Sequence, residues 1–87
     1  MNQIISKKIE QKIHETSLNK HELQKLAKAL SSVDDSKSFV FGIVVGRLYN
    51  AFYYQTKRIL EREPNDSEFK EFLELIESKK PDLDNLW

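Results

Sequence analysis

The chain has 87 residues, with fourteen basic and fourteen acidic side chains, two glycines, two prolines and no cysteine. The absence of cysteine excludes disulfides and thiolate metal sites, and the scarcity of turn residues argues against a many-stranded β fold. Because the helix formers Leu, Ile, Lys and Glu are plentiful, we predict an all-α protein, a small four-helix bundle with a long central third helix and a single domain over residues 1–87.

The zero net charge hides an uneven distribution along the chain. Residues 1–62 carry eleven basic and six acidic side chains, a balance of +5, whereas residues 63–87 carry three and eight, a balance of −5. Such a division suggests either a basic surface that binds a polyanion or charge pairing within the protein or between copies.

The sequence contains neither a secretory-signal pattern nor a membrane-span pattern. Its first twelve residues, MNQIISKKIEQK, have no long apolar region. The longest apolar run is the eight residues 39–46, far short of the roughly 20 that a spanning helix needs. We therefore expect a soluble cytoplasmic protein without a membrane partner.

The first two predicted helices cover about residues 3–16 and 19–32. In the first, Ile5, Ile9 and Ile13 recur every four residues and form a narrow apolar stripe. The second begins with Asn19 followed by Glu22, the spacing of a capping box. Its predicted core face consists of Leu23, Leu26, Ala27 and Leu30.

The third predicted helix covers about residues 36–62, since Asp34, Asp35 and Ser36 can each cap its start and no breaker precedes Pro64. On a wheel of 100° per residue, one side is broad and apolar and is expected to face the other helices. The opposite side is a narrower stripe, apolar in its first two turns and basic afterwards. The members of this outer stripe are Val40, Val44, Arg47, Ala51, Tyr54, Arg58 and Arg62.

The presence of Gly42 and Gly46 inside the third helix calls for an explanation, because a glycine inside a helix lowers its stability by about 1 kcal/mol relative to alanine. They lie on one side of the helix and leave its backbone bare. Three explanations stay open: close packing on another helix of the same chain, a crossing between two copies, or a ligand near the bare backbone. Val40 and Val44 point away from this groove and must be covered by the tail with Leu86 and Trp87, by the first helix or by a second copy. The thin core and the long central helix favour a second copy. We therefore predict a homodimer whose interface includes Val40, Gly42, Val44 and Gly46.

The fourth predicted helix covers about residues 66–79, with Asn65 or Asp66 as its cap and Glu68 in its first turn. Its predicted apolar face consists of Phe69, Phe72, Leu73 and Ile76. The remaining acidic tail, residues 82–87, contains Leu83, Leu86 and Trp87. A disordered tail would seldom hold the only tryptophan, so we expect it to dock on the bundle.

The basic and aromatic part of the third helix is the candidate binding surface. Arginine binds phosphate through two parallel hydrogen bonds, and tyrosine offers a platform on which a base can stack. The candidate contacts to an anion or a nucleic acid are Arg47, Tyr54, Lys57, Arg58 and Arg62. The alternative is charge pairing with the acids of the fourth helix, Glu68, Glu71, Glu74 and Glu77, and a pI near 6.7 is low for a dedicated nucleic-acid binder.

No residue pattern specifies a reaction. The two histidines, His14 and His21, flank a turn between helices, and their spacing does not bring them together as metal ligands. There is no nucleophile–base set and no phosphate-binding glycine loop. We therefore expect a non-enzymatic protein-interaction or structural module without a cofactor or metal, which associates with itself through the third helix. Nucleic-acid binding is the alternative function.

Overall fold

A computed structural model describes residues 1–29 and 36–84, and within these ranges the chain forms α-helices and no strand. The helices are α1 (Gln3–Leu18), α2 (Lys20–Ala29), α3 (Ser36–Leu60), α4 (Asp66–Ser78) and α5 (Lys80–Asp84). The predicted all-α fold with a long third helix is confirmed. The short fifth helix was not predicted; Pro81 lies in its first turn, where a residue needs no amide donor.

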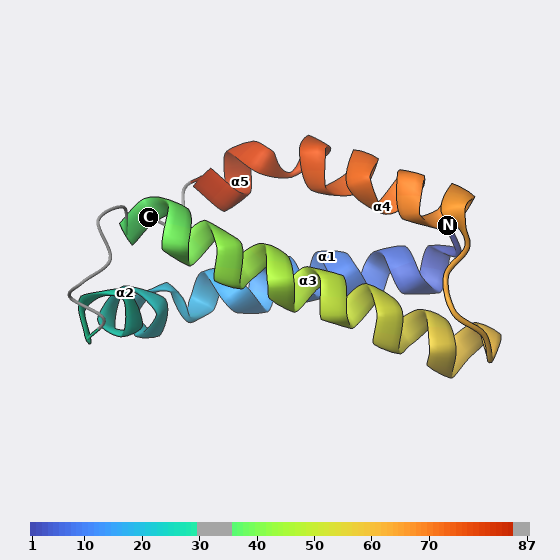
Figure 1. Ribbon diagram of the computed structural model, residues 1–87, viewed down its shortest axis with the longest axis horizontal. Helices are drawn as coiled ribbons and strands as arrows, with labels where there is room; N and C mark the ends of the chain where they lie inside the picture. Colours follow the sequence, from blue (N-terminus) through green and yellow to red (C-terminus); the bar gives the residue numbers. More distant parts are fainter. Residues whose placement is uncertain (30–35, 85–87) are drawn as a thin grey trace.

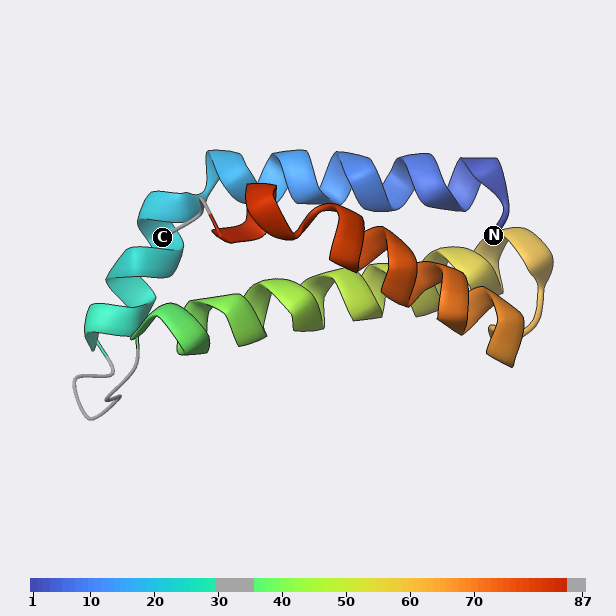
Figure 2. The same cartoon turned by 90° about the horizontal axis from the view of Figure 1, so that it is seen from above.

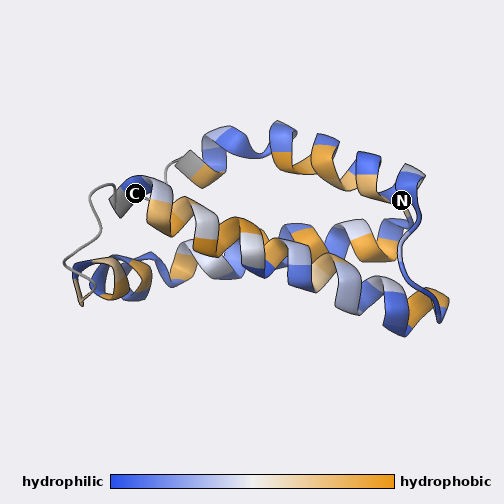
Figure 3. Cartoon of the chain, viewed as in Figure 1, coloured by the Kyte–Doolittle hydropathy of each residue, from blue (hydrophilic) through white to orange (hydrophobic). Residues whose placement is uncertain are grey.

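The helices build an elongated bundle of 40 × 21 × 20 Å (Figure 1). Helices α1 and α3 pack along the long axis, and α4 lies over the space between them (Figure 2). Helix α2 is short and leaves the end of α1 at an angle (Figure 2). The apolar side of α4 faces α1 and α3, and its polar side points away from them (Figure 3).

Two asparagines cap helix starts. The Asn2 side chain accepts hydrogen bonds from the amides of Ile4 and Ile5, at 2.8 and 3.3 Å, and thereby begins α1. At α4 the Asn65 side chain accepts from the Glu68 amide at 2.8 Å, and the Glu68 carboxylate accepts from the Asn65 amide at 3.0 Å. This reciprocal pair is a capping box, so the predicted start of the fourth helix is confirmed.

The capping box predicted at Asn19 is wrong. Asn19 is the C-cap of α1, and its backbone amide donates to the Thr16 carbonyl. The Asn19 carbonyl accepts from the amides of Glu22 and Leu23, so a single turn residue joins α1 to α2. Because Asn19 follows α1 directly and has a φ of −104° and a ψ of 16°, it lacks the extended conformation of an N-cap, and its side chain makes no capping bond. The preceding Leu18 is exposed.

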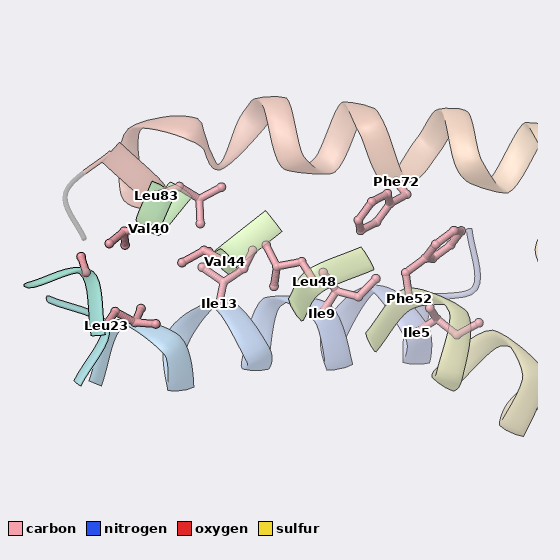
Figure 4. Packing of buried hydrophobic residues seen from close by; sticks show 11 residues of the cluster. Ile5, Ile9, Ile13, Leu23, Val40, Val44, Leu48, Phe52, Phe72 and Leu83 are labelled. Carbon is pink, nitrogen blue, oxygen red and sulfur yellow. The ribbon is translucent and has the colours of Figure 1, made fainter. Parts of the chain in front are cut away.

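One hydrophobic core runs the length of the bundle (Figure 4). The predicted isoleucine stripe of α1 forms its floor, with Ile5, Ile9 and Ile13 all buried. Phe72 from α4 and Leu83 from α5 close the core from the other side (Figure 4). The buried members are Ile5, Ile9, Ile13, Leu23, Ala27, Val40, Val44, Leu48, Phe52, Phe72 and Leu83.

The faces of α3 differ from the prediction. Its buried residues recur strictly every four positions, and the same spacing on the opposite side gives a stripe exposed to solvent. This spacing is that of the ridges along which helices commonly interlock. The buried line is Val40, Val44, Leu48, Phe52 and Thr56. The exposed stripe is Ser38, Gly42, Gly46, Asn50, Tyr54 and Arg58.

Two consequences correct the predicted interface. Val40 and Val44 are only 2% and 1% exposed and belong to the core of the single chain, so they do not face outward. Gly42 and Gly46 lie on the exposed stripe, and a Cβ atom added to either would meet no atom of residues 1–29 and 36–84 within 4 Å. Close packing against another helix of the same chain therefore does not explain the glycines.

The end of α3 lies before the predicted one. Glu61 adopts a φ of 57°, in the left-handed region, which ends the helix after Leu60 and turns the chain toward α4. Arg62 therefore lies beyond α3 and does not belong to a stripe on that helix.

Several predictions concern residues outside the described ranges. They are the core position of Leu30, the caps at Asp34 and Asp35, and the docking of Leu86 and Trp87. Within the tail, Leu83 lies in α5 and is buried in the core. In residues 1–29 and 36–84, no helix is long and apolar enough to cross a membrane.

Candidate functional site

An apolar surface is exposed along α3 and α4. Helix α3 contributes Gly42, Gly46 and Tyr49, and α4 contributes Phe69 and Leu73. Leu73 is 51% exposed although the sequence places it on the apolar side of its helix. We call these five residues the apolar face. Its exposed aromatic and aliphatic groups lie next to a stretch of bare helix backbone.

An open hollow lies between the two helices at one end of the apolar face. It has a volume of about 510 Å³ and is lined by Phe41 of α3, by Leu73, Ile76 and Glu77 of α4, and by Lys80 of α5. A smaller hollow of about 210 Å³ adjoins Phe41 and Lys80 and reaches Lys37. The apolar walls therefore carry charged residues of both signs at their rim.

Aromatic rings connect the apolar face to the core. Tyr49 lies 5.0 Å from Tyr53 and 6.4 Å from Phe69, measured between ring centroids. A hydrogen bond with Tyr49 raises the pKa of the Tyr53 hydroxyl above its ordinary value. These contacts hold the Tyr49 ring at the surface without burying it.

A second surface feature is a polar cleft between α1 and α3. It has a volume of about 330 Å³ and continues into a second hollow of about 190 Å³. Helix α3 supplies the polar groups Arg47, Asn50, Tyr54 and Gln55, and α1 supplies lysines. We call this feature the α1/α3 cleft; its cationic side chains are Lys8, Lys12 and Arg47.

The structure separates the predicted anion contacts. Arg47 and Tyr54 meet in the α1/α3 cleft. Arg58 donates through Nε and Nη2 to the Gln55 amide oxygen, at 3.1 and 2.9 Å, and Lys57 is exposed outside the cleft. Arg62 is farther away, where its guanidinium donates to both carboxylate oxygens of Glu68.

The Arg62–Glu68 ion pair is a contact of the kind expected under the alternative interpretation, in which the arginines pair with the acidic side chains of the fourth helix. The hydrogen bond from Arg62, with a further one from the Asn65 amide, lowers the pKa of the Glu68 carboxyl. The same carboxylate raises the pKa of Arg62. A second acid of α4, Glu71, pairs with the amino group of Met1. These pairs connect α4 to the end of α3 and to the start of the chain.

In the described part of the chain, no group of three or more histidine and carboxylate side chains is placed to hold a metal ion. The candidate surfaces described above are the apolar face and the α1/α3 cleft.

A comparison with protein-family models finds no match, and comparisons with curated proteins and with solved structures find none either. The function is therefore argued from the two surfaces themselves.

From the sequence we placed Phe69 and Leu73 on the apolar face of the fourth helix. We also expected the broad side of the third helix, to which Tyr49 belongs, to face the other helices, and so missed the exposed apolar face. The length of the chain did indicate that some apolar side chains would stay exposed, because a chain of this length has a thin core. Residues 38–62 carry apolar side chains on nearly every side of the predicted helix. This apolar surface is larger than two or three short neighbouring helices can cover.

Proposed function

We propose that the protein is a small helical interaction module that associates with a second copy of itself through the apolar face. The observation that carries this proposal is the open space beside Gly42 and Gly46, next to the exposed side chains of Tyr49 and Leu73. Glycines weaken an exposed helix by about 1 kcal/mol each, and the described part of the single chain places no atom against them that would compensate. A helix of a second copy crossing there would use the bare backbone for close packing.

The size of the exposed surface supports this proposal. The accessible surface of the chain is 5947 Å², whereas a folded monomer of 10.3 kDa is expected to expose about 5,400 Å². The radius of gyration is 13.9 Å, against about 12 Å for a compact chain of this length. A single copy thus leaves more surface open than its mass requires, and a partner would bury part of it.

The charge distribution also favours a second copy as the partner. The net charge is zero, so two copies do not repel one another as a whole. The charges also allow complementary contacts in a two-fold symmetric dimer. In such a dimer the basic segment of one copy, residues 1–62, can face the acidic segment of the other, residues 63–87. The proposed role requires no catalytic group and no cofactor.

Analytical ultracentrifugation from low to high micromolar concentration tests the proposal. We expect a reversible monomer–dimer equilibrium that Leu73→Lys weakens at least ten-fold, because a charge would enter the apolar face. Leu18→Lys is the matched control: Leu18 is an exposed leucine of α1 outside this face, so its change should leave the equilibrium unaltered. A wild-type chain that stays monomeric throughout, or equal effects of both variants, would contradict the proposal.

A further inference from the structure

The α1/α3 cleft lies on a different side of α3 from α4 and is independent of the apolar face. Arg47 and Ala51 line its α3 wall, and Lys12 lines its α1 wall. At its rim stands Tyr54, with 64% of its surface exposed. The cleft is therefore lined mainly by charged and polar residues and has a flat aromatic ring at its edge.

Three of its polar side chains have no partner in the part of the chain that the structure describes. Among the described residues, Arg47, Asn50 and Tyr54 make no side-chain hydrogen bond or ion pair. The neighbouring arginines differ, because Arg58 is bound to Gln55 and Arg62 to Glu68. Of these three arginines, Arg47 is the one without a partner among the described residues, and it lines the cleft.

The charge in the cleft is positive. Lys8, Lys12 and Arg47 contribute three cations, and the acid that lines it is Glu15. Glu15 contacts Lys12 at 3.3 Å, with the two side chains 44% and 37% exposed. An exposed pair of this kind contributes only about 0–1 kcal/mol, so a stronger anion can displace the carboxylate from the lysine.

We propose that the α1/α3 cleft binds a nucleotide unit, with the phosphate held by Arg47 and Lys12 and the base stacked on Tyr54. Arginine and lysine provide charge-assisted donors to phosphate oxygens, and an exposed tyrosine ring stacks on any base. The amides of Asn50 and Gln55 can donate to and accept from the edge of the base. The volume of about 330 Å³ is at the small end of ligand sites and suits one nucleotide.

The same chemistry is present in a free nucleotide and in a single strand of nucleic acid. A titration of the full chain, followed by amide chemical shifts, separates the two sources. The probes are inorganic phosphate, a nucleoside monophosphate, a short single-stranded oligonucleotide and its duplex. We expect the single strand to bind at low salt, with log K falling against log salt at a slope of about −2 for three cations. The duplex should bind more weakly, since its base faces are closed.

Two variants examine the phosphate and the base separately. Lys12→Gln should weaken the single strand and the mononucleotide alike and reduce the salt slope by about 0.7. Tyr54→Leu should weaken both about five-fold or more and leave binding of inorganic phosphate unchanged. Lys7→Gln is the matched control, because Lys7 is an exposed lysine of the same helix and does not line the cleft. Circular dichroism of each variant verifies that the fold is intact.

Each outcome decides a point. Tighter binding of the oligonucleotide than of the mononucleotide supports a single-stranded nucleic acid, and equal binding supports a free nucleotide. The absence of any binding at low salt overturns the proposal. It is also overturned if Lys7→Gln weakens binding as much as Lys12→Gln, or if the duplex binds as well as the single strand, because either result indicates attraction by charge alone. None of these outcomes affects the proposed self-association, which is measured without ligand.

Discussion

Phe52 of α3 and Phe72 of α4 stack face to face, with ring centroids 4.6 Å apart and planes inclined by 12°. Both rings are buried, and Figure 4 shows them between the two helices above Ile5 of α1. Next to Phe72 in sequence, Leu73 is half exposed. One edge of α4 is thus attached to the bundle through a buried aromatic stack, while Leu73 on the neighbouring edge stays open to solvent.

Phe72→Ala should lower the free energy of unfolding by about 3–5 kcal/mol, because it removes a buried ring and leaves a cavity beside Phe52. Leu73→Ala, one residue along the same helix, should lower it by about 0.5 kcal/mol, since half of that side chain is already in solvent. Urea denaturation at low protein concentration measures both values. Similar losses for the two variants would show that the stack does not hold α4.

Val44→Asp should abolish or severely weaken folding instead of yielding a stable monomer. Val44 lies in the core, so the variant would bury a charge without a partner, at a loss of at least about 3 kcal/mol. Asn50→Asp on the exposed stripe of the same helix introduces the same charge at a solvated position and should change stability little. Thermal unfolding followed by circular dichroism compares the two variants. A fully folded Val44→Asp monomer would contradict the burial of Val44 in the core of the single chain.

The sequence predicted the elements of this fold better than their faces. Ile5, Ile9 and Ile13 were placed correctly because a short helix with a single apolar stripe has one way to face a core. Helix α3 has apolar groups on most sides. A helical wheel of 100° per residue therefore did not identify its buried side, and we placed Val40 and Val44 on the side facing away from the other helices. Its true core line steps by four residues and therefore moves 40° around the helix at each step, a path set by the neighbouring helices and absent from local sequence.

The two asparagine cap signals show the same limit. Asn65 and Asn19 each precede a glutamate by three residues, yet the reciprocal hydrogen bonds form at Asn65 alone of the two. At Asn65 the chain arrives from Pro64 in an extended conformation, which a cap requires, whereas at Asn19 it arrives from a helix. The candidate surfaces depended on tertiary packing in the same way: Arg47 and Tyr54 were foreseen, but their position opposite the lysines of α1 was not fixed by the pattern.

Gly46→Ala should raise the stability of the single chain by about 1 kcal/mol, because the added methyl group meets open space and alanine favours the helix. If two copies cross at this position, the same methyl group separates their backbones and weakens the dimer. Denaturation at low concentration and ultracentrifugation at high concentration measure the two effects. Asn50→Ala, one turn along the exposed stripe, is the control that should improve the helix without changing association.

The Arg62–Glu68 pair should give the protein an acid-dependent component of stability. The pKa of the Glu68 carboxyl is lowered in the folded chain by Arg62 and by the Asn65 amide, whereas in the unfolded chain it has the ordinary value of about 4.3. A lowered pKa in the folded state means that the contribution is fully present above the ordinary value. It is lost as the pH falls through the folded pKa.

Glu68→Gln should therefore remove this part of the pH dependence, because the amide cannot ionise but can still accept the hydrogen bond from the Asn65 amide. Asn65→Ala provides the contrast. It removes the side-chain cap and should lower the free energy of unfolding by about 1 kcal/mol at every pH, while the ion pair, and with it the acid dependence, remains. Urea midpoints measured between neutral pH and pH values below the ordinary carboxyl range distinguish the two. An unchanged acid dependence in Glu68→Gln would show that other carboxylates cause it.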